Sequence, residues 1–215
     1  MTYLEAINSV LRRLREDQVD TALESDYSSL IGDFVNDAIK QVENAWSWSA
    51  LRSTVVIPTV SGTEEYSLTD SGQDAVVKQV INDTSNKTMA LETQAYFNSV
   101  YYLQDVVSGS PVAYIHSGVD ANDDLKVKVY PRPDGIYSLR FDLTLPQGTL
   151  SSDSTKIKVP YNPVIQMAFA MALRERGETG GQSALEQFAV ASTALSDAIA
   201  IDANRYPEET TFMVV

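Results

Sequence analysis

Apolar positions recur with a helical period at the start of the chain. Leu4, Ile7, Leu11 and Leu14 lie three or four residues apart within residues 2–16. This spacing places them on one narrow face of a helix, while the charged residues of the segment fall on the other faces. The pattern predicts an amphipathic helix that needs a packing partner.

A second and wider apolar stripe follows the polar stretch ESDYSS, whose serines and aspartate are candidate helix N-caps. It consists of Leu30, Ile31, Phe34, Val35, Ala38, Ile39, Val42 and Trp46. The stripe predicts a second helix that ends at a pair of tryptophans, Trp46 and Trp48.

From residue 53 the runs become short and β-prone, with turn sequences between them. The runs are STVVIPTV, EEYSL, AVVKQVI, KTMAL, SPVAYIHS, DLKVKVYP, IYSLRFDLTL and KIKVP. Ser61-Gly62-Thr63 between the first two runs predicts one hairpin, and AVVKQVI with KTMAL predicts another. A short helix is expected at 93–104.

Helical periodicity returns near residue 161. In YNPVIQMAFAMALRERG, Pro163 suits the first turn and Gly177 suits the C-cap. The middle of this segment is apolar on nearly all sides, which predicts a helix surrounded by other helices. A last helix follows GETGG (177–181), which has no P-loop spacing and is read as a turn between helices. Its apolar positions are Leu185, Phe188, Leu195 and Ile199.

We therefore predict an α+β fold, in which N- and C-terminal helix pairs form one bundle with an inserted antiparallel β-rich domain and an extended C-terminal arm. The predicted parts are 1–52 (first half of the bundle), 53–160 (β-rich domain), 161–204 (second half of the bundle) and 205–215 (arm). Trp46, Trp48 and Leu51 lie where the chain leaves the bundle, and large rings there are expected to pack the β domain against the helices.

Charge and composition narrow the function. The chain has 29 acidic and 16 scattered basic residues, and a net charge of −13, which disfavours binding of nucleic acid by phosphate neutralisation. An acidic wall can still let DNA slide past it, although solubility explains the charge equally well. There are no cysteines, so disulfides and thiolate metal sites are excluded. No signal peptide is predicted, and the longest apolar run, 164–173, is too short to cross a membrane.

The search for catalytic or metal-binding patterns predicts no enzyme, metal or cofactor. His116 is the only histidine and has no nucleophile motif near it, so a structural or surface role is expected. GVDANDD (118–124) lacks the spacing of an EF-hand and is read as a polar hairpin loop. AYFNSVYY (95–102) is either a binding platform or a helix packed on a sheet, and packing is favoured.

The C-terminal stretch RYPEETTFMVV ends in β-prone apolar residues after Pro207, which stops the helix. Two interpretations stay open, since the tail either packs on the protein's own core or binds another chain. The residues assigned to this arm are Arg205, Tyr206, Pro207, Phe212, Met213, Val214 and Val215.

Three stretches resemble the head-to-tail adaptor proteins of tailed bacteriophages, the family that includes the tail tubular A proteins of short-tailed phages. They are FVNDAIKQVENAWSWSALR, VKVYPRPDGIYSLRFDL and NPVIQMAFAMALRERGETGGQSALEQFAVASTALSDAIAIDANRYPEE. The resemblance implies a virion protein assembled in the host cytoplasm as a ring of twelve copies below the portal. It also implies an arm that reaches the portal protein ring, a lower face that docks the tail nozzle or next tail component, and a channel that DNA crosses without specific binding.

Within that resemblance, polar loops are candidates for the lower face. They carry Asp120, Asn122, Asp123, Asp124 and Asp134. Two alternatives remain open. One is a virion-associated enzyme that degrades peptidoglycan, and the other is a tail protein that binds the host surface through the region of Tyr101, Tyr102 and Tyr114.

Overall fold

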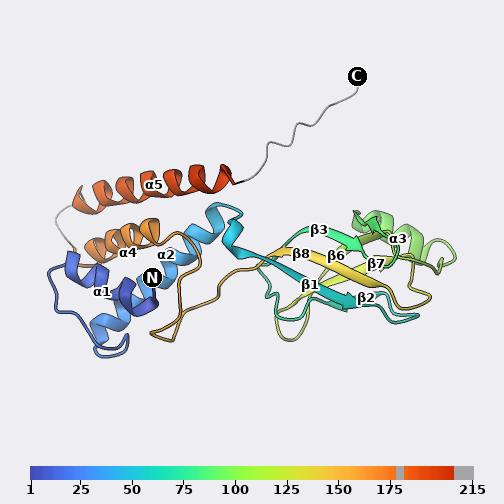
Figure 1. The fold of residues 1–215 in the computed structure, drawn as a ribbon, viewed down its shortest axis with the longest axis horizontal. Coiled ribbons are helices and arrows are strands. Elements are labelled where there is room, and N and C mark those ends of the chain that lie inside the picture. Colours follow the sequence, from blue (N-terminus) through green and yellow to red (C-terminus); the bar gives the residue numbers. More distant parts are fainter. Residues whose placement is uncertain (178–181, 206–215) are drawn as a thin grey trace, which may run out of the picture. The chain divides into compact units, whose positions relative to one another are not determined.

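The computed structural model describes residues 1–177 and 182–205 and has an α+β fold with helices at both ends of the chain, as the sequence predicted. The chain divides into two compact units (Figure 1). The helical unit comprises Met1–Leu51 and Gln147–Val215, and the β unit comprises Arg52–Pro146. The predicted arm lies outside the described residues except for Arg205.

In its described residues, the helical unit has four helices and one 3-10 turn. They are α1 (Tyr3–Arg13), α2 (Asp26–Ala45), η1 (Ser49–Leu51), α4 (Tyr161–Glu175) and α5 (Gln182–Ala203). The starts of α1 and α2 are set by reciprocal capping of Thr2 with Glu5 and of Ser25 with Ser28. Ser25 belongs to the polar stretch that was expected to cap the second helix, so that prediction is confirmed.

Helix α4 is the centre of the helical unit, as its apolar sequence predicted. It contacts α1, α2 and α5, and it lies between α5 and the other two helices (Figure 1). Val164, Ala168 and Ala172 are fully buried. Gly177 follows the last turn with φ +64°, the left-handed conformation that favours glycine at this position. Helices α1, α2 and α5 thus all bury apolar residues against α4.

The segment 147–160, which the sequence placed in the β-rich domain, belongs to the helical unit. The run KIKVP forms no strand there, so its β assignment was wrong. Its backbone pairs instead with the start of the chain, since Ile157 N donates to Met1 O at 3.0 Å. Leu150, Ile157 and Val159 are buried in the helical core. Apolar burial among helices therefore prevailed over the local β propensity.

The β unit consists of two four-stranded sheets and one helix. The strands are β1 (Arg52–Pro58), β2 (Glu65–Ser67), β3 (Val76–Asn82), β4 (Lys87–Thr88), β5 (Ala90–Leu91), β6 (Ala113–Val119), β7 (Leu125–Tyr130) and β8 (Ser138–Thr144), and the helix is α3 (Gln94–Tyr102). One sheet has the order β1-β8-β3-β4 and the other β2-β7-β6-β5. Apolar residues from both sheets, including Val80, Tyr114, Val127 and Phe141, share one core.

Strand pairing agrees with the sequence in part. The predicted hairpin of AVVKQVI with KTMAL is present as the β3–β4 pair, which is short because β5 pairs in parallel with β6. The predicted hairpin around Ser61-Gly62-Thr63 is wrong, because β1 pairs with β8 and β2 with β7. Local turn chemistry could not show that the chain changes sheets at this point. The β5–β6 pair also makes the second sheet mixed instead of wholly antiparallel.

The aromatic stretch 95–102 forms α3 and packs on the second sheet. Phe97 and Tyr101 are buried against Ala113 and Ile115 of β6, which confirms the packing interpretation. Tyr102 is 71% exposed. Of the three tyrosines considered for host binding, Tyr101 and Tyr114 are buried and Tyr102 faces solvent.

Helix α5 has an unusual composition for an outer helix. Its residues Ser183–Ala203 are long and apolar enough to cross a membrane, and only 11% of the window tested is buried. Length and composition alone are weak evidence for a membrane span, because helices of soluble proteins can have both. The sequence predicted no membrane span, because small residues interrupt the large apolar residues of α5.

We predict that Trp48→Ala lowers the free energy of unfolding of the helical unit by about 3–5 kcal/mol, the usual cost of removing a large buried ring. Trp48 is 1% exposed. Thermal melting followed by circular dichroism at the helix band measures the change. Tyr102→Ala, which removes an exposed ring, is the control and should melt like the wild type. An unchanged melting temperature for Trp48→Ala would contradict the burial.

Candidate functional site

Helix α2 ends at Ala45 because Trp46 takes an extended conformation, with φ −155° and ψ 155°. The carbonyls of the last helical turn then need partners from outside the helix. Trp48 supplies one, since its indole Nε1 donates to the carbonyl of Val42 at 2.7 Å. The second tryptophan thus satisfies the helix end and fills the core at the same time. This explains why the helix ends on two aromatic residues.

The carboxylate of Asp202, near the end of α5, lies against this helix end. Oδ2 accepts hydrogen bonds from Trp46 Nε1 at 3.1 Å and from Ser49 N at 3.0 Å. Oδ1 accepts from Ser49 Oγ at 2.6 Å and from Arg205 Nη1 at 3.1 Å. The Asp202 side chain is only 5% exposed. A nearly buried carboxylate with four donors ties the end of the last helix to the point where the chain leaves α2.

Electrostatics favour the ionised form of Asp202. Burial by itself raises the pKa of this carboxyl, but the hydrogen bonds from the hydroxyl and amide of Ser49, the indole of Trp46 and the charge of Arg205 outweigh burial and lower the pKa below its ordinary value. The network is therefore intact at neutral pH. It acts as a structural clasp, since all four donors are engaged in holding the carboxylate of Asp202.

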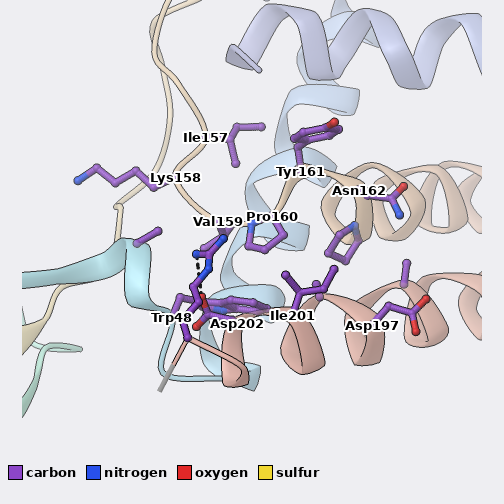
Figure 2. A pocket seen from close by; sticks show the side chains of 15 residues that line it. Trp48, Ile157, Lys158, Val159, Pro160, Tyr161, Asn162, Asp197, Ile201 and Asp202 are labelled. Atoms are coloured by element: carbon purple, nitrogen blue, oxygen red, sulfur yellow. Dashed lines mark hydrogen bonds and ion pairs between the residues drawn. The ribbon is translucent and has the colours of Figure 1, made fainter. Parts of the chain in front are cut away.

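A cavity of about 450 Å³ adjoins this network within the helical unit (Figure 2). Its walls are mainly apolar and include Trp48, Val159, Pro160 and Ile201. Asp202 and Arg205 lie at the same cavity, as Figure 2 shows for Asp202. Mainly apolar walls beside a carboxylate that is already hydrogen-bonded suit the binding of an apolar side chain.

The structure brings together the predicted junction residues. Trp48 and Leu51 are buried in the core of the helical unit and Trp46 packs against it. Of the predicted arm, Arg205 is described and donates to Ser49 Oγ at 3.0 Å as well as to Asp202. The other arm residues lie outside the described residues. They are Tyr206, Pro207, Phe212, Met213, Val214 and Val215.

The predicted loop residues 120–124 form the β6–β7 turn. Asp120 Oδ1 accepts from Asn122 N at 2.8 Å and from Asp124 N at 3.1 Å, which shapes the turn. Asp123 has φ +63°, as is common in tight turns. Asp124 differs from its neighbours because it is buried and accepts from the backbone N–H of Asp70 and Gly72. Its carboxylate is used inside the β unit.

The remaining candidates lie apart from one another. Asp134 accepts from the hydroxyl of Tyr137 at 2.6 Å in a separate loop. His116 is exposed on β6, with its ring 5.9 Å from that of Tyr114. Within residues 1–177 and 182–205, no group of three or more histidine, aspartate or glutamate side chains is arranged to hold a metal ion.

Sequence reasoning missed Asp202. A single aspartate in a helix matches neither a paired-carboxylate pattern nor a metal-binding motif. A signal was present, because Asp202 falls among alanines and isoleucines in the stretch AIAIDA. A charged residue in such a stretch needs a partner when it is buried, and only the tertiary structure supplies Ser49 and Trp46.

We predict that Asp202→Asn destabilises the helical unit at pH 7 by about 1.5–3 kcal/mol, since hydrogen bonds to charged groups contribute that much. The pKa of Asp202 in the folded state lies below the unfolded value of about 3.9. Its stabilisation is therefore complete above that value and is lost as pH falls through the folded-state pKa.

Melting temperatures of the wild type and Asp202→Asn at pH 7 and pH 3 test the direction of this pH dependence. The difference between wild type and Asp202→Asn should shrink at pH 3, and an equal difference at the two pH values would contradict an ionised clasp. Asp197→Asn is the matched control, because Asp197 is exposed on the same helix and forms no ion pair with the residues that the structure describes.

Comparison with known proteins identifies the family of the chain. No curated protein matches the chain. A family model described as SU10 adaptor protein matches residues 1–211, which is nearly the whole chain. The resemblance to head-to-tail adaptors is thereby confirmed: the chain belongs to the SU10 adaptor protein family, a family of phage head-tail adaptors, and is a structural component of the virion that associates with other head and tail components.

Proposed function

We propose that this adaptor forms a ring of twelve copies beneath the portal, continues the DNA channel and docks the next tail component. The family match over residues 1–211 carries the proposal. A ring subunit contacts different surfaces of its two neighbours, so it needs a rigid body with more than one interaction surface. A helical unit with a tight core and a separate β sandwich suits this requirement.

The wall of the channel is proposed to include the exposed face of α2. Asp26, Asp33 and Asp37 are exposed at spacings of seven and four residues, which is a helical repeat, and Lys40 follows one turn later. Three carboxylates against one amine give the face a negative potential, which repels the phosphates of DNA and prevents the polymer from sticking. In this proposal, the acidic composition of the chain lets DNA slide through the channel.

The C-terminal arm is proposed to contact the portal. Arg205 is held by Ser49 and Asp202, so the arm departs from a defined point of the helical unit. Beyond that point the arm carries an apolar end, Phe212 to Val215, which suits addition to a groove or sheet edge of another protein. Trp46, Trp48 and Leu51 keep the departure point rigid through the same network and core.

The loops of the β unit are proposed to contact the next tail component. Asp120, Asn122 and Asp123 occupy the β6–β7 turn, and Asp134 lies in the loop before β8. Asp124 would act indirectly, because its buried carboxylate holds the turn against Asp70 and Gly72. Neither a peptidoglycan-degrading nor a host-binding function is favoured by a specific observation in the described residues, and we propose that the protein is not an enzyme.

Deletion of residues 206–215 tests the portal contact. Truncation after Arg205 keeps the contacts of that residue with Ser49 and Asp202, so the helical unit should melt like the wild type. We expect the full-length protein to co-sediment with the portal ring of its own phage. The truncated protein should bind at least about tenfold more weakly, because a few apolar anchors dominate such contacts. Equal binding of the two proteins would show that the arm does not contribute to the portal contact. No binding by either protein would contradict a ring beneath the portal.

Charge reversal on α2 tests the channel wall. Asp33→Lys with Asp37→Lys should slow the release of DNA from particles that carry the variant, because lysines bind phosphates. Release is followed with a DNA-binding dye at low and high salt, and the delay should be smaller at high salt. Asp74→Lys with Asp105→Lys makes the same charge change on the β unit and serves as the control. Unchanged release in the α2 variant would place its face outside the channel.

A further inference from the structure

Helix α5 exposes an apolar face that nothing in the described part of the chain covers. It packs on α4 through Ala184, Ala191 and Ala198, which are buried. Val190 and Ile201 point away from that contact and lie on one side of α5 together with Asp197, with 49% and 62% of the surface of the two apolar residues exposed. An exposed apolar stripe on a helix of which little is buried is characteristic of a surface that another molecule covers.

The charges of α5 restrict what can cover it. From residue 183 to 203 the helix has no lysine or arginine, and its exposed charges are Glu186 and Asp197. Asp197 forms no ion pair with any described residue. The covering surface should therefore combine apolar side chains with positive charge.

The outer face of α1 has these properties. A hollow of about 310 Å³ on it is lined by Met1, Leu4, Glu5 and Arg12, among others, and the Glu5 carboxylate is already used in the helix cap. Arg12 and Arg15 are exposed and form no ion pairs within the described ranges. The outer face of α2 is the alternative, but its carboxylates would repel those of α5. The face of α1 is thus the better electrostatic match.

The two faces belong to opposite edges of the helical unit. Helix α4 lies between α5 on one side and α1 with α2 on the other (Figure 1). A contact between α5 and α1 therefore cannot form within one chain. Between chains it is heterologous, the type of contact that closes into a ring when it is repeated.

We infer that the exposed face of α5 docks on the outer face of α1 in a second copy of this protein, with Asp197 facing Arg12 and Arg15. This contact rests on the proposed ring and specifies one of its lateral interfaces. Val190 and Ile201 supply apolar contact area on α5, and Met1 and Leu4 supply it on α1. An 11-residue helix is about 16 Å long, so the contact is one part of a larger interface.

Charge exchange tests the pairing. Asp197→Arg and Arg12→Asp each place like charges at the contact, and each should weaken ring formation on the portal by about tenfold. The double variant restores opposite charges at every interface of the ring and should recover assembly. Asp74→Arg makes the same charge change on the β unit, away from both helix faces, and is the control for net charge. Sedimentation velocity measures the rings, and thermal melting confirms that each variant folds.

The outcomes separate this contact from the ring itself. If the wild type forms no ring, the proposed function fails and the contact fails with it. If the wild type forms a ring but the single variants assemble normally, or the double variant does not recover, only the contact is wrong.

Covalent trapping provides a second measurement, because the chain has no cysteine of its own. Arg15→Cys with Ser196→Cys in one chain should give a ladder of linked multimers when a bismaleimide is added to the ring. Each single cysteine variant should give no ladder. Linked dimers from Ser196→Cys alone would mean that two α5 helices meet, which would overturn the inference.

A lipid surface is the other occupant that an apolar helix face suggests. Flotation with vesicles of phosphatidylcholine and phosphatidylglycerol distinguishes it. We expect the wild type to remain in the protein fraction. Flotation of the wild type that is abolished by Ile201→Glu would assign the face to a membrane and overturn the contact between copies.

Discussion

Burial of helix α4 is the constraint on which the helical unit depends. This helix is apolar on nearly all sides, so it is stable only when other helices surround it. Its partners come from both ends of the chain, since α1 and α2 precede the β unit and α5 follows it. The core therefore cannot form from either end alone. The β unit, Arg52–Pro146, is consequently inserted into a helical bundle that is built from helices before and after it in the chain.

The network around Asp202 fixes the place where that closure is completed. It joins the last turn of α5 to the residues just after α2, and one carboxylate satisfies the indole of Trp46, the amide and hydroxyl of Ser49 and the guanidinium of Arg205. A buried charge with these donors is stable only in one arrangement. This arrangement fixes the end of α5 against the residues that follow α2.

Local patterns were sufficient to predict the helices, most strands and the α+β class. The seam from Leu4 to Leu14, the wide stripe of α2 and the all-round apolar α4 each have a period that only one type of element satisfies. The sequence also carried the resemblance to adaptors, because that resemblance is itself a pattern of packing positions. Local patterns were not sufficient to predict which strands pair. Which strands share a sheet around Ser61-Gly62-Thr63, and whether KIKVP joins the sheet or the helices, depend on partners far away in sequence.

The junction shows most clearly what tertiary structure decided. Trp46 and Trp48 stood out in the sequence because two large rings at a change of period are unusual. Their roles could not be read there, since Trp48 satisfies a carbonyl of its own helix end while Trp46 needs Asp202, 156 residues later. The sequence by itself determined which residues had to be buried, because the cost of exposing apolar surface depends on residue type. Only the folded chain decided which polar groups meet, because a hydrogen bond requires two specific atoms about 3 Å apart.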